Sequence, residues 1–456
     1  MTSPNGSVQR DSWGTRGGFL LAAVGSAVGL GNMWRFSYVA AEGGGAAFVL
    51  LYLGFVAFIG MPLMMSEFVV GRMTQVSPVE AVKRLGGKRW VPLGVLFAFC
   101  GLGILSYYSV IAGWTMRYSV DAVRGAIPDD AGAYFGAVGT GWPAVLTHLM
   151  FMAITVAIVL RGIKQGLERT AIILMPLLVL LLVGLAIWAT TLSGGGAGYA
   201  YYLRPRLSEL MDPAIITDAA GQAFFSLSLG MGALMTYASY LKTKENLAKE
   251  TVTIAMSDFG VAFLAGLFIF PIIFHFNLVD TIGLGGELNT DSTVGTLFIA
   301  MPAAVKSLGT MGNFVIAAFF VMLFFAALTS AISLLEVVVT AVIDSWHWSR
   351  ARAAIVAGAF ITLLGIPSAF NLNFLDVGDK LIGTVLLMVG GLFTAILVGY
   401  KILPEAEREV RDGMDNPALI SAWKFFIRYL IPPVLVVVLI FSIPKLLTAV
   451  RTLIGV

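Results

Sequence analysis

The chain has 456 residues, of which 58% are hydrophobic and only 12% are charged, and its formal net charge is +3. Together with a mean hydropathy of +0.89, this composition excludes an ordinary soluble globular protein and predicts a polytopic membrane protein. The small positive charge is typical of loops at a membrane surface and does not indicate a nucleic-acid partner. The single cysteine, Cys100, excludes an intrachain disulfide, and the three histidines are too far apart to indicate a metal site.

Eleven apolar stretches are long enough to span a lipid bilayer as helices. Lys and Arg gather in alternate loops between them, which places those loops and the N-terminus in the cytoplasm. An odd number of helices then places the C-terminus outside, so we expect a multi-pass protein of the cell inner (plasma) membrane. The predicted spans are 16–40, 46–71, 91–123, 143–161, 167–192, 213–240, 254–279, 309–343, 352–368, 379–402 and 424–448.

The first span contains a run of small and polar residues, Ser26 to Asn32, where a plain membrane helix would be apolar. Gly29 and Gly31 allow the backbone to leave helical geometry. The freed N–H and C=O groups must be satisfied within the membrane, so such a break usually lines a ligand cavity. Considered alone, the run is equally consistent with a glycine-rich contact between packed helices.

The sixth span contains a second break over residues 224–232, again with serines and glycines among apolar residues. Because spans one and six are five apart, they cross the membrane in opposite directions, which favours an inverted repeat with a site between the two breaks. The predicted organisation is an N-terminal tail and first five-helix repeat in 1–192, an external connection in 193–212, the second repeat in 213–402, and a linker, eleventh helix and short tail in 403–456.

Further polar side chains lie in the seventh and eighth spans. The carboxylate of Asp258 is costly within an apolar helix, so it is a candidate partner for a bound cation. Thr329 and Ser330 offer hydroxyl oxygens, which hard cations prefer, although such hydroxyls usually bond to their own backbone. The longest external loop, 280–308, could form a lid.

The stretches Ser26–Phe36, Gln222–Tyr240 and Phe324–Ser330, with Gly162–Arg169 between them, resemble the neurotransmitter:sodium symporter family, in particular its bacterial amino-acid members with eleven helices. The resemblance implies an all-α, leucine-transporter-like fold of two inverted five-helix repeats plus one extra helix. It implies sodium-coupled import of hydrophobic L-amino acids by alternating access, without enzymatic activity. The alternatives are another small carboxylate substrate for the same fold, or, from another class, an ion channel.

The resemblance also implies two bound sodium ions. The first site would use Ala27, Asn32, Ser226 and Asp258, together with the carboxylate of the substrate. The second would use Gly25, Val28, Ala326, Thr329 and Ser330. Asp258 stands where an amide is common in relatives, and its charge leads us to expect no chloride requirement.

The implied substrate site lies between the two breaks. Its residues would be Ser26, Ala27, Leu30, Gly31, Ile104, Tyr108, Phe225, Ser226, Ser228, Met231 and Leu334. The apolar members should reject charged side chains through the cost of desolvation. Gly29 stands where monoamine members of the family carry an Asp, so the substrate must bring its own carboxylate. Taken singly, Tyr108, Phe225 and Met231 are more typical of ordinary helix packing.

The resemblance implies gates on both sides of the substrate. The outer gate would be Arg35 and Asp379 with Gln222, and the inner gate Arg10 and Asp344 with Trp13 and Tyr240 nearby. Charged residues at the ends of spans can instead serve only as membrane anchors, and the roles of Glu67 and Glu168 stay open. The expected partners are the bilayer and a hydrophobic amino acid, with no nucleic acid and with a monomer or weak homodimer as the assembly.

Overall fold

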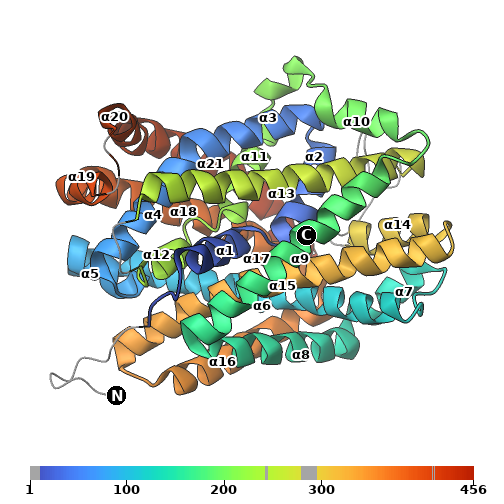
Figure 1. The fold of residues 1–456 in the computed structure, drawn as a ribbon, viewed down its shortest axis with the longest axis horizontal. Helices are drawn as coiled ribbons and strands as arrows, with labels where there is room; N and C mark the ends of the chain where they lie inside the picture. Colours follow the sequence, from blue (N-terminus) through green and yellow to red (C-terminus); the bar gives the residue numbers. More distant parts are fainter. Residues whose placement is uncertain (1–10, 242–244, 279–294, 413, 415, 456) are drawn as a thin grey trace.

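The computed structural model describes residues 11–241, 245–278, 295–412, 414 and 416–455. Its regular elements are all helices, most of them running roughly along one direction (Figure 1). Within the described residues, nine helices are long and apolar enough to cross a membrane. Spans one and six are each interrupted, and with them the number of spans matches the eleven predicted.

The first five spans follow the predicted order, joined by short helices. They are α1 (Arg16–Ala27) with α2 (Phe36–Glu42), α3 (Ala46–Phe55) with α4 (Met61–Thr74), α6 (Val91–Val123), α8 (Gly141–Val159) and α9 (Arg169–Ala189), with α5 (Pro78–Gly86), α7 (Ala131–Val138) and α10 (Gly195–Leu203) as connections. Proline begins α5 and glycine follows it, the usual signals for the start and end of a short helix.

The remaining spans begin with the second broken helix. They are α11 (Pro213–Ser226) with α12 (Ala233–Ala238), α13 (Leu247–His275), α15 (Thr310–Trp346), α16 (Arg350–Phe370), α17 (Leu372–Lys380) with α18 (Leu387–Ile396), and α20 (Pro417–Phe425) with α21 (Ile431–Ile454), connected by α14 (Gly295–Lys306) and α19 (Leu403–Arg411). Turns of π-helix, such as η6 (Leu381–Leu386), join several of these pairs into continuous helices.

Several predicted boundaries differ from the structure, most of all the starts of the seventh, tenth and eleventh spans, which lie seven residues earlier than predicted, at Leu247, Leu372 and Pro417. The tenth span begins at Leu372 rather than at residue 379, because Asp376 and Lys380 form an ion pair of 2.7 Å one turn apart and so are accommodated within the helix. In the predicted lid loop 280–308, residues Gly295–Lys306 form α14. Residues 280–294 of that loop lie outside the described part of the chain.

The interrupted helices lie at the centre of the bundle and the last span lies at its edge. In Figure 1, α1 and α12 sit among the long helices α6, α13 and α15. Of the most apolar stretch of each span, 72% is buried in α15 but only 22% in the eleventh span. Helices α1 and α15 approach closely because Gly25 faces Thr329, where an added Cβ would lie 3.3 Å from the threonine Cβ.

Candidate functional site

The first break follows Ala27, the last residue of α1. Val28 is extended, with ψ of 101°, and the chain resumes a helical turn at Gly31. A Cβ on Gly29 would lie 2.5 Å from the Ser330 hydroxyl, and one on Gly31 would lie 2.8 Å from the Phe225 ring. Glycine is therefore required at both positions because neighbouring helices pack directly against the backbone.

The second break separates α11 from α12. Ser228, Gly230 and Gly232 all have positive φ, of 53°, 74° and 72°, which a regular right-handed helix cannot contain. The freed N–H of Gly230 donates to Glu67 Oε1 at 2.8 Å, and Glu67 is buried in α4. Glu67 thus supports the broken backbone from the neighbouring span, which gives a structural role to a residue whose role the sequence left open.

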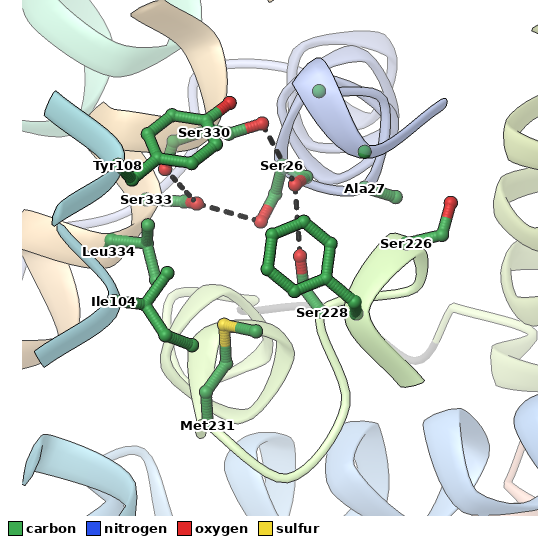
Figure 2. Close-up of a pocket in the computed structure, with 13 residues that line it drawn as sticks. Ser26, Ala27, Ile104, Tyr108, Ser226, Ser228, Met231, Ser330, Ser333 and Leu334 are labelled. Atoms are coloured by element: carbon green, nitrogen blue, oxygen red, sulfur yellow. Dashed lines mark hydrogen bonds between the residues drawn. The ribbon is translucent and has the colours of Figure 1, made fainter. Parts of the chain in front are cut away.

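A cavity lies between the two breaks (Figure 2). It is lined by Ser26, Ala27, Gly29, Gly31, Ile104, Tyr108, Phe225, Ser226, Ser228, Met231, Ser330, Ser333 and Leu334. Every residue predicted to bind substrate is in this set except Leu30, whose N–H donates to the Tyr108 hydroxyl at 3.2 Å. Ser333 was not predicted.

The Asp258 cluster consists of Asn32, Tyr52, Ser226 and Asp258. Asn32 Nδ2 lies 2.6 Å from Asp258 Oδ1, the Tyr52 hydroxyl donates to Oδ2 at 3.0 Å, and the Ser226 hydroxyl lies 2.9 Å from both oxygens. Asp258 is fully buried, and no ion pair of the described residues includes it. A buried carboxylate with only neutral partners is suited to binding a cation.

Asn32 and Ala27, two members of the predicted first sodium site, lie at the first break. Asn32 turns its nitrogen toward Asp258, while its oxygen accepts from Gly29 N at 2.9 Å. The side-chain oxygen of Asn32 thus faces Gly29 rather than the Asp258 carboxylate. Ala27 is the last helical residue before the first break, so its carbonyl lies where the regular hydrogen bonds of α1 stop.

The Ser330 cluster is formed by Gly25, Val28, Ala326, Thr329 and Ser330, the residues of the predicted second sodium site. Here the contacts are longer: Ser330 Oγ lies 3.5 Å from the Gly25 carbonyl oxygen, and Thr329 Oγ1 lies 3.0 Å from the carbonyl of Ala326. Thr329 thus bonds back to its own helix, as hydroxyls in membrane helices usually do. All oxygens in this cluster are neutral.

On one side of the cavity, Arg35 and Asp379 approach each other as predicted, with Nη2 and Oδ2 3.7 Å apart. Arg35 also donates to the Thr384 hydroxyl at 3.0 Å and lies over the Phe225 ring, 4.8 Å from its centre. Gln222 donates to the carbonyl of Gly31 at 2.9 Å. This layer covers the cavity through side chains of α11, the tenth span and the segment after the first break.

On the other side, Trp13 is buried and donates from Nε1 to the carbonyl of Tyr237 at 2.9 Å. Tyr240 donates to the buried Glu336, which also pairs with Arg350 at 2.8 Å. Asp344 accepts from the N–H of Ser77 at 2.5 Å. Arg10, the predicted partner of Asp344, lies outside the described residues.

Glu168 adds a further contact on this side. Its carboxylate accepts from the N–H groups of Gly14 and Thr15, at 2.7 and 3.1 Å, and from the Thr15 hydroxyl at 2.9 Å. The residue is 5% exposed. Glu168 therefore attaches the chain before α1 to the start of the fifth span, an arrangement that satisfies N–H groups at the beginning of α1.

Sequence reasoning missed several residues that the structure brings into these layers. They are Tyr107, whose hydroxyl donates to Asp379 at 3.2 Å, and the pair Glu336 and Arg350. For Glu336 a signal existed, because it is an acid within an apolar span, the same feature that identified Asp258. Tyr107 carries no comparable signal in one sequence.

The comparisons with known proteins agree with this geometry. The chain matches the model of the sodium:neurotransmitter symporter family over residues 10–134 and 134–451. It is 33% identical to the uncharacterized sodium-dependent transporter YhdH of Bacillus subtilis, over 93% of this chain and 96% of that protein. It is 32% identical to an uncharacterized sodium-dependent transporter of Haemophilus influenzae, over 95% of this chain and 98% of the relative.

Among solved structures, the chain is similar to MhsT in its complex with L-phenylalanine, with a TM-score of 0.86 and 39% identity over 95% of this chain and 100% of that one. This match establishes the leucine-transporter-like fold, and the family match excludes an enzyme and identifies a multi-pass membrane protein. The chain belongs to the sodium:neurotransmitter symporter family and is a sodium-dependent membrane transporter.

Proposed function

We propose that the protein imports hydrophobic L-amino acids together with sodium by alternating access. The observation that supports this proposal is that one part of the cavity wall is polar and another part is apolar. The polar part consists of backbone groups freed at the two breaks and of the hydroxyls of Tyr108 and Ser228. The apolar part consists of the side chains of Ile104, Met231 and Leu334. The similar MhsT structure contains L-phenylalanine, which combines the same two chemistries.

In this proposal the substrate carboxylate meets the N–H groups of Leu30 and Gly31 and the Tyr108 hydroxyl. Its ammonium meets carbonyls at the two breaks and the hydroxyl of Ser228, which now donates to the carbonyl of Ser26 at 2.9 Å. Broken helices suit such zwitterions because N–H groups face the anion and carbonyls face the cation. A charged substrate side chain would be desolvated against the apolar wall without a partner, and so would be rejected.

The first sodium ion would bind in the Asp258 cluster, held by Ala27, Asn32, Ser226 and Asp258 and by the substrate carboxylate. Support comes from the burial of Asp258 and from the absence of a cationic partner in the described ion pairs. The second ion would bind in the Ser330 cluster, where carbonyls at the end of α1 face hydroxyls of α15. Both sites offer only oxygen, the ligand that hard cations prefer.

Chloride would not be required for transport. The carboxylate of Asp258 already supplies a negative charge beside the first sodium site, and a chloride ion close to it would be repelled in a buried, low-dielectric environment. Ala262, one helical turn after Asp258 on the same face of α13, has no hydrogen-bond donor for an anion.

The two closing layers would open in turn. The layer of Arg35 and Asp379 faces the outside and the layer around Trp13 faces the cytoplasm, with the N-terminus inside and the C-terminus outside. The positive loops support this orientation. We expect a monomer or weak homodimer in the cell inner membrane, built from the two inverted repeats 1–192 and 213–402.

Uptake of radiolabelled phenylalanine and leucine into proteoliposomes tests this function. With an inward sodium gradient, both should accumulate above the equilibrium level, and collapse of the gradient with a sodium ionophore should abolish accumulation. Replacement of external sodium by potassium is the matched control. Uptake that is equal with and without the sodium gradient, or its absence for every hydrophobic amino acid, would contradict the proposal.

A further inference from the structure

Two serine hydroxyls meet in the wall of the cavity. Ser26 in α1 and Ser333 in α15 are far apart in sequence, yet their Oγ atoms are 2.8 Å apart. Both residues are buried, with 2% and 1% of their surface exposed. Figure 2 shows the pair beside the apolar side chains of Ile104 and Leu334, so the apolar wall contains one polar point.

The hydrogen-bond chain determines what this point offers to a ligand. The Ser333 hydroxyl lies 2.8 Å from the carbonyl oxygen of Ser330, which can only accept, so Ser333 must donate to it. Ser333 therefore accepts from Ser26, and the hydrogen of the Ser26 hydroxyl is already used. Among the described residues no donor is bonded to Ser26 Oγ, so its free lone pairs present an acceptor.

Resting on the function proposed above, we infer that the Ser26–Ser333 pair selects aromatic amino acids whose side chain carries an N–H or O–H donor, such as tryptophan and tyrosine, over phenylalanine. A donor would satisfy the buried acceptor. Phenylalanine would displace water from it and leave it without a partner, which disfavours binding. The pair is thus a specificity determinant within the same cavity.

The test compares ligands of matched shape as competitors of sodium-driven phenylalanine uptake in proteoliposomes. Tryptophan is compared with 3-benzothienylalanine, in which sulfur replaces the N–H group, and tyrosine is compared with 4-fluorophenylalanine. In each pair the donor-bearing ligand should compete more strongly by about three- to tenfold, the ratio expected for one neutral hydrogen bond.

Two variants separate the roles of the hydroxyls. Ser26→Ala removes the acceptor, so both ratios should fall to about one. Ser333→Ala frees the hydrogen of the Ser26 hydroxyl, which can then donate to a ligand. O-methyltyrosine, whose side chain can only accept a hydrogen bond, should therefore compete more strongly in this variant than in the unmodified protein. Ser442→Ala is the control, because Ser442 lies in α21 and donates only to its own helix, at 2.9 Å from the Val438 carbonyl; both ratios should stay as in the unmodified protein.

Ratios near one in the unmodified protein, in the presence of normal phenylalanine uptake, would overturn this inference and leave the proposed function standing. An equal loss of affinity for all four ligands in Ser26→Ala would also overturn it, because Ser26 would then contact the common amino-acid part. Absence of sodium-driven phenylalanine uptake would overturn both. If Ser26→Ala fails to fold, the unmodified ratios and Ser333→Ala decide the question.

Discussion

The Asp258 cluster and the Ser330 cluster flank the same cavity but differ in charge and in tightness. In the first, a fully buried carboxylate has contacts between 2.6 and 3.0 Å with Asn32, Ser226 and Tyr52. In the second, neutral oxygens of α1 and α15 lie up to 3.5 Å apart. The difference implies unequal ion sites. One depends on a formal charge, and the other depends on how closely two helices approach.

The largest effect on sodium dependence should come from removal of the negative charge of Asp258. Asp258→Asn should raise the sodium concentration needed for half-maximal uptake by about 100-fold, since loss of one partner from a buried charged interaction costs about 3 kcal/mol. Sodium titration of phenylalanine uptake measures the shift. Asp218→Asn is the control, because Asp218 pairs with Lys445 at the protein surface. An unchanged sodium dependence of Asp258→Asn would place the ion elsewhere.

Of the two ion clusters, only the Asp258 cluster should depend on the substrate carboxylate. Tryptamine, which lacks it, should compete with phenylalanine uptake roughly 30-fold less well than tryptophan, because hydrogen bonds to a charged group contribute about 2 kcal/mol. Competition assays at saturating sodium measure this ratio. If tryptamine competed as well as tryptophan, no substrate carboxylate would complete the first sodium site. The inference from Gly29 that the substrate must bring its own carboxylate would then be wrong.

A gate variant can separate transport from ion binding. Arg35→Ala removes the ion pair with Asp379 and the bond to Thr384, so uptake should fall roughly tenfold, the lower end of the range for hydrogen bonds to a charged group, because both side chains are partly exposed. Equilibrium binding of phenylalanine and its sodium dependence should change by less than about twofold, since both ion clusters keep their residues. Normal uptake by a well-expressed variant would remove the gate assignment. Arg206→Ala, which affects an exposed arginine, is the control.

Loss of one ligand from the Ser330 cluster should change the sodium requirement less than loss of the Asp258 charge. Thr329→Ala removes one uncharged oxygen and should raise the sodium requirement by about fivefold, as for one neutral hydrogen-bonding group. Thr329→Ser keeps the hydroxyl and should restore the dependence. Thr362→Ala is a matched control, because Thr362 makes the same kind of bond to its own helix. If Thr329→Ala raised the sodium requirement as much as Asp258→Asn does, the claim that the two ion sites are unequal would be contradicted.

Local sequence signals predicted the breaks and most spans because glycine, serine and isolated charges stand out in apolar helices. Gly29, Gly230 and Asp258 were found in this way. The start of the tenth span was placed too late, because Asp376 and Lys380 neutralise each other within the helix. Ser333 could not be assigned, since its role depends on Ser26, a partner brought close only by folding.

The contacts that close the cavity on its two sides were predicted only in part from the sequence. It paired Arg35 with Asp379 from the family resemblance, and the structure places them 3.7 Å apart. It did not predict the pair of the buried Glu336 and the half-buried Arg350 next to Tyr240, which links α15 to the start of α16. Such a pair arises from the packing of helix ends, and the periodicity of apolar residues contains no information about it.

The claim that Asp258 supplies the negative charge beside sodium is tested most directly by replacing the anion. Sodium-driven phenylalanine uptake should be equal, within about twofold, in chloride and in gluconate, because one buried carboxylate replaces the anion. Asp258→Asn should then be slow in gluconate and faster in chloride. Strong stimulation of the unmodified protein by chloride would contradict the account and would require another partner for Asp258.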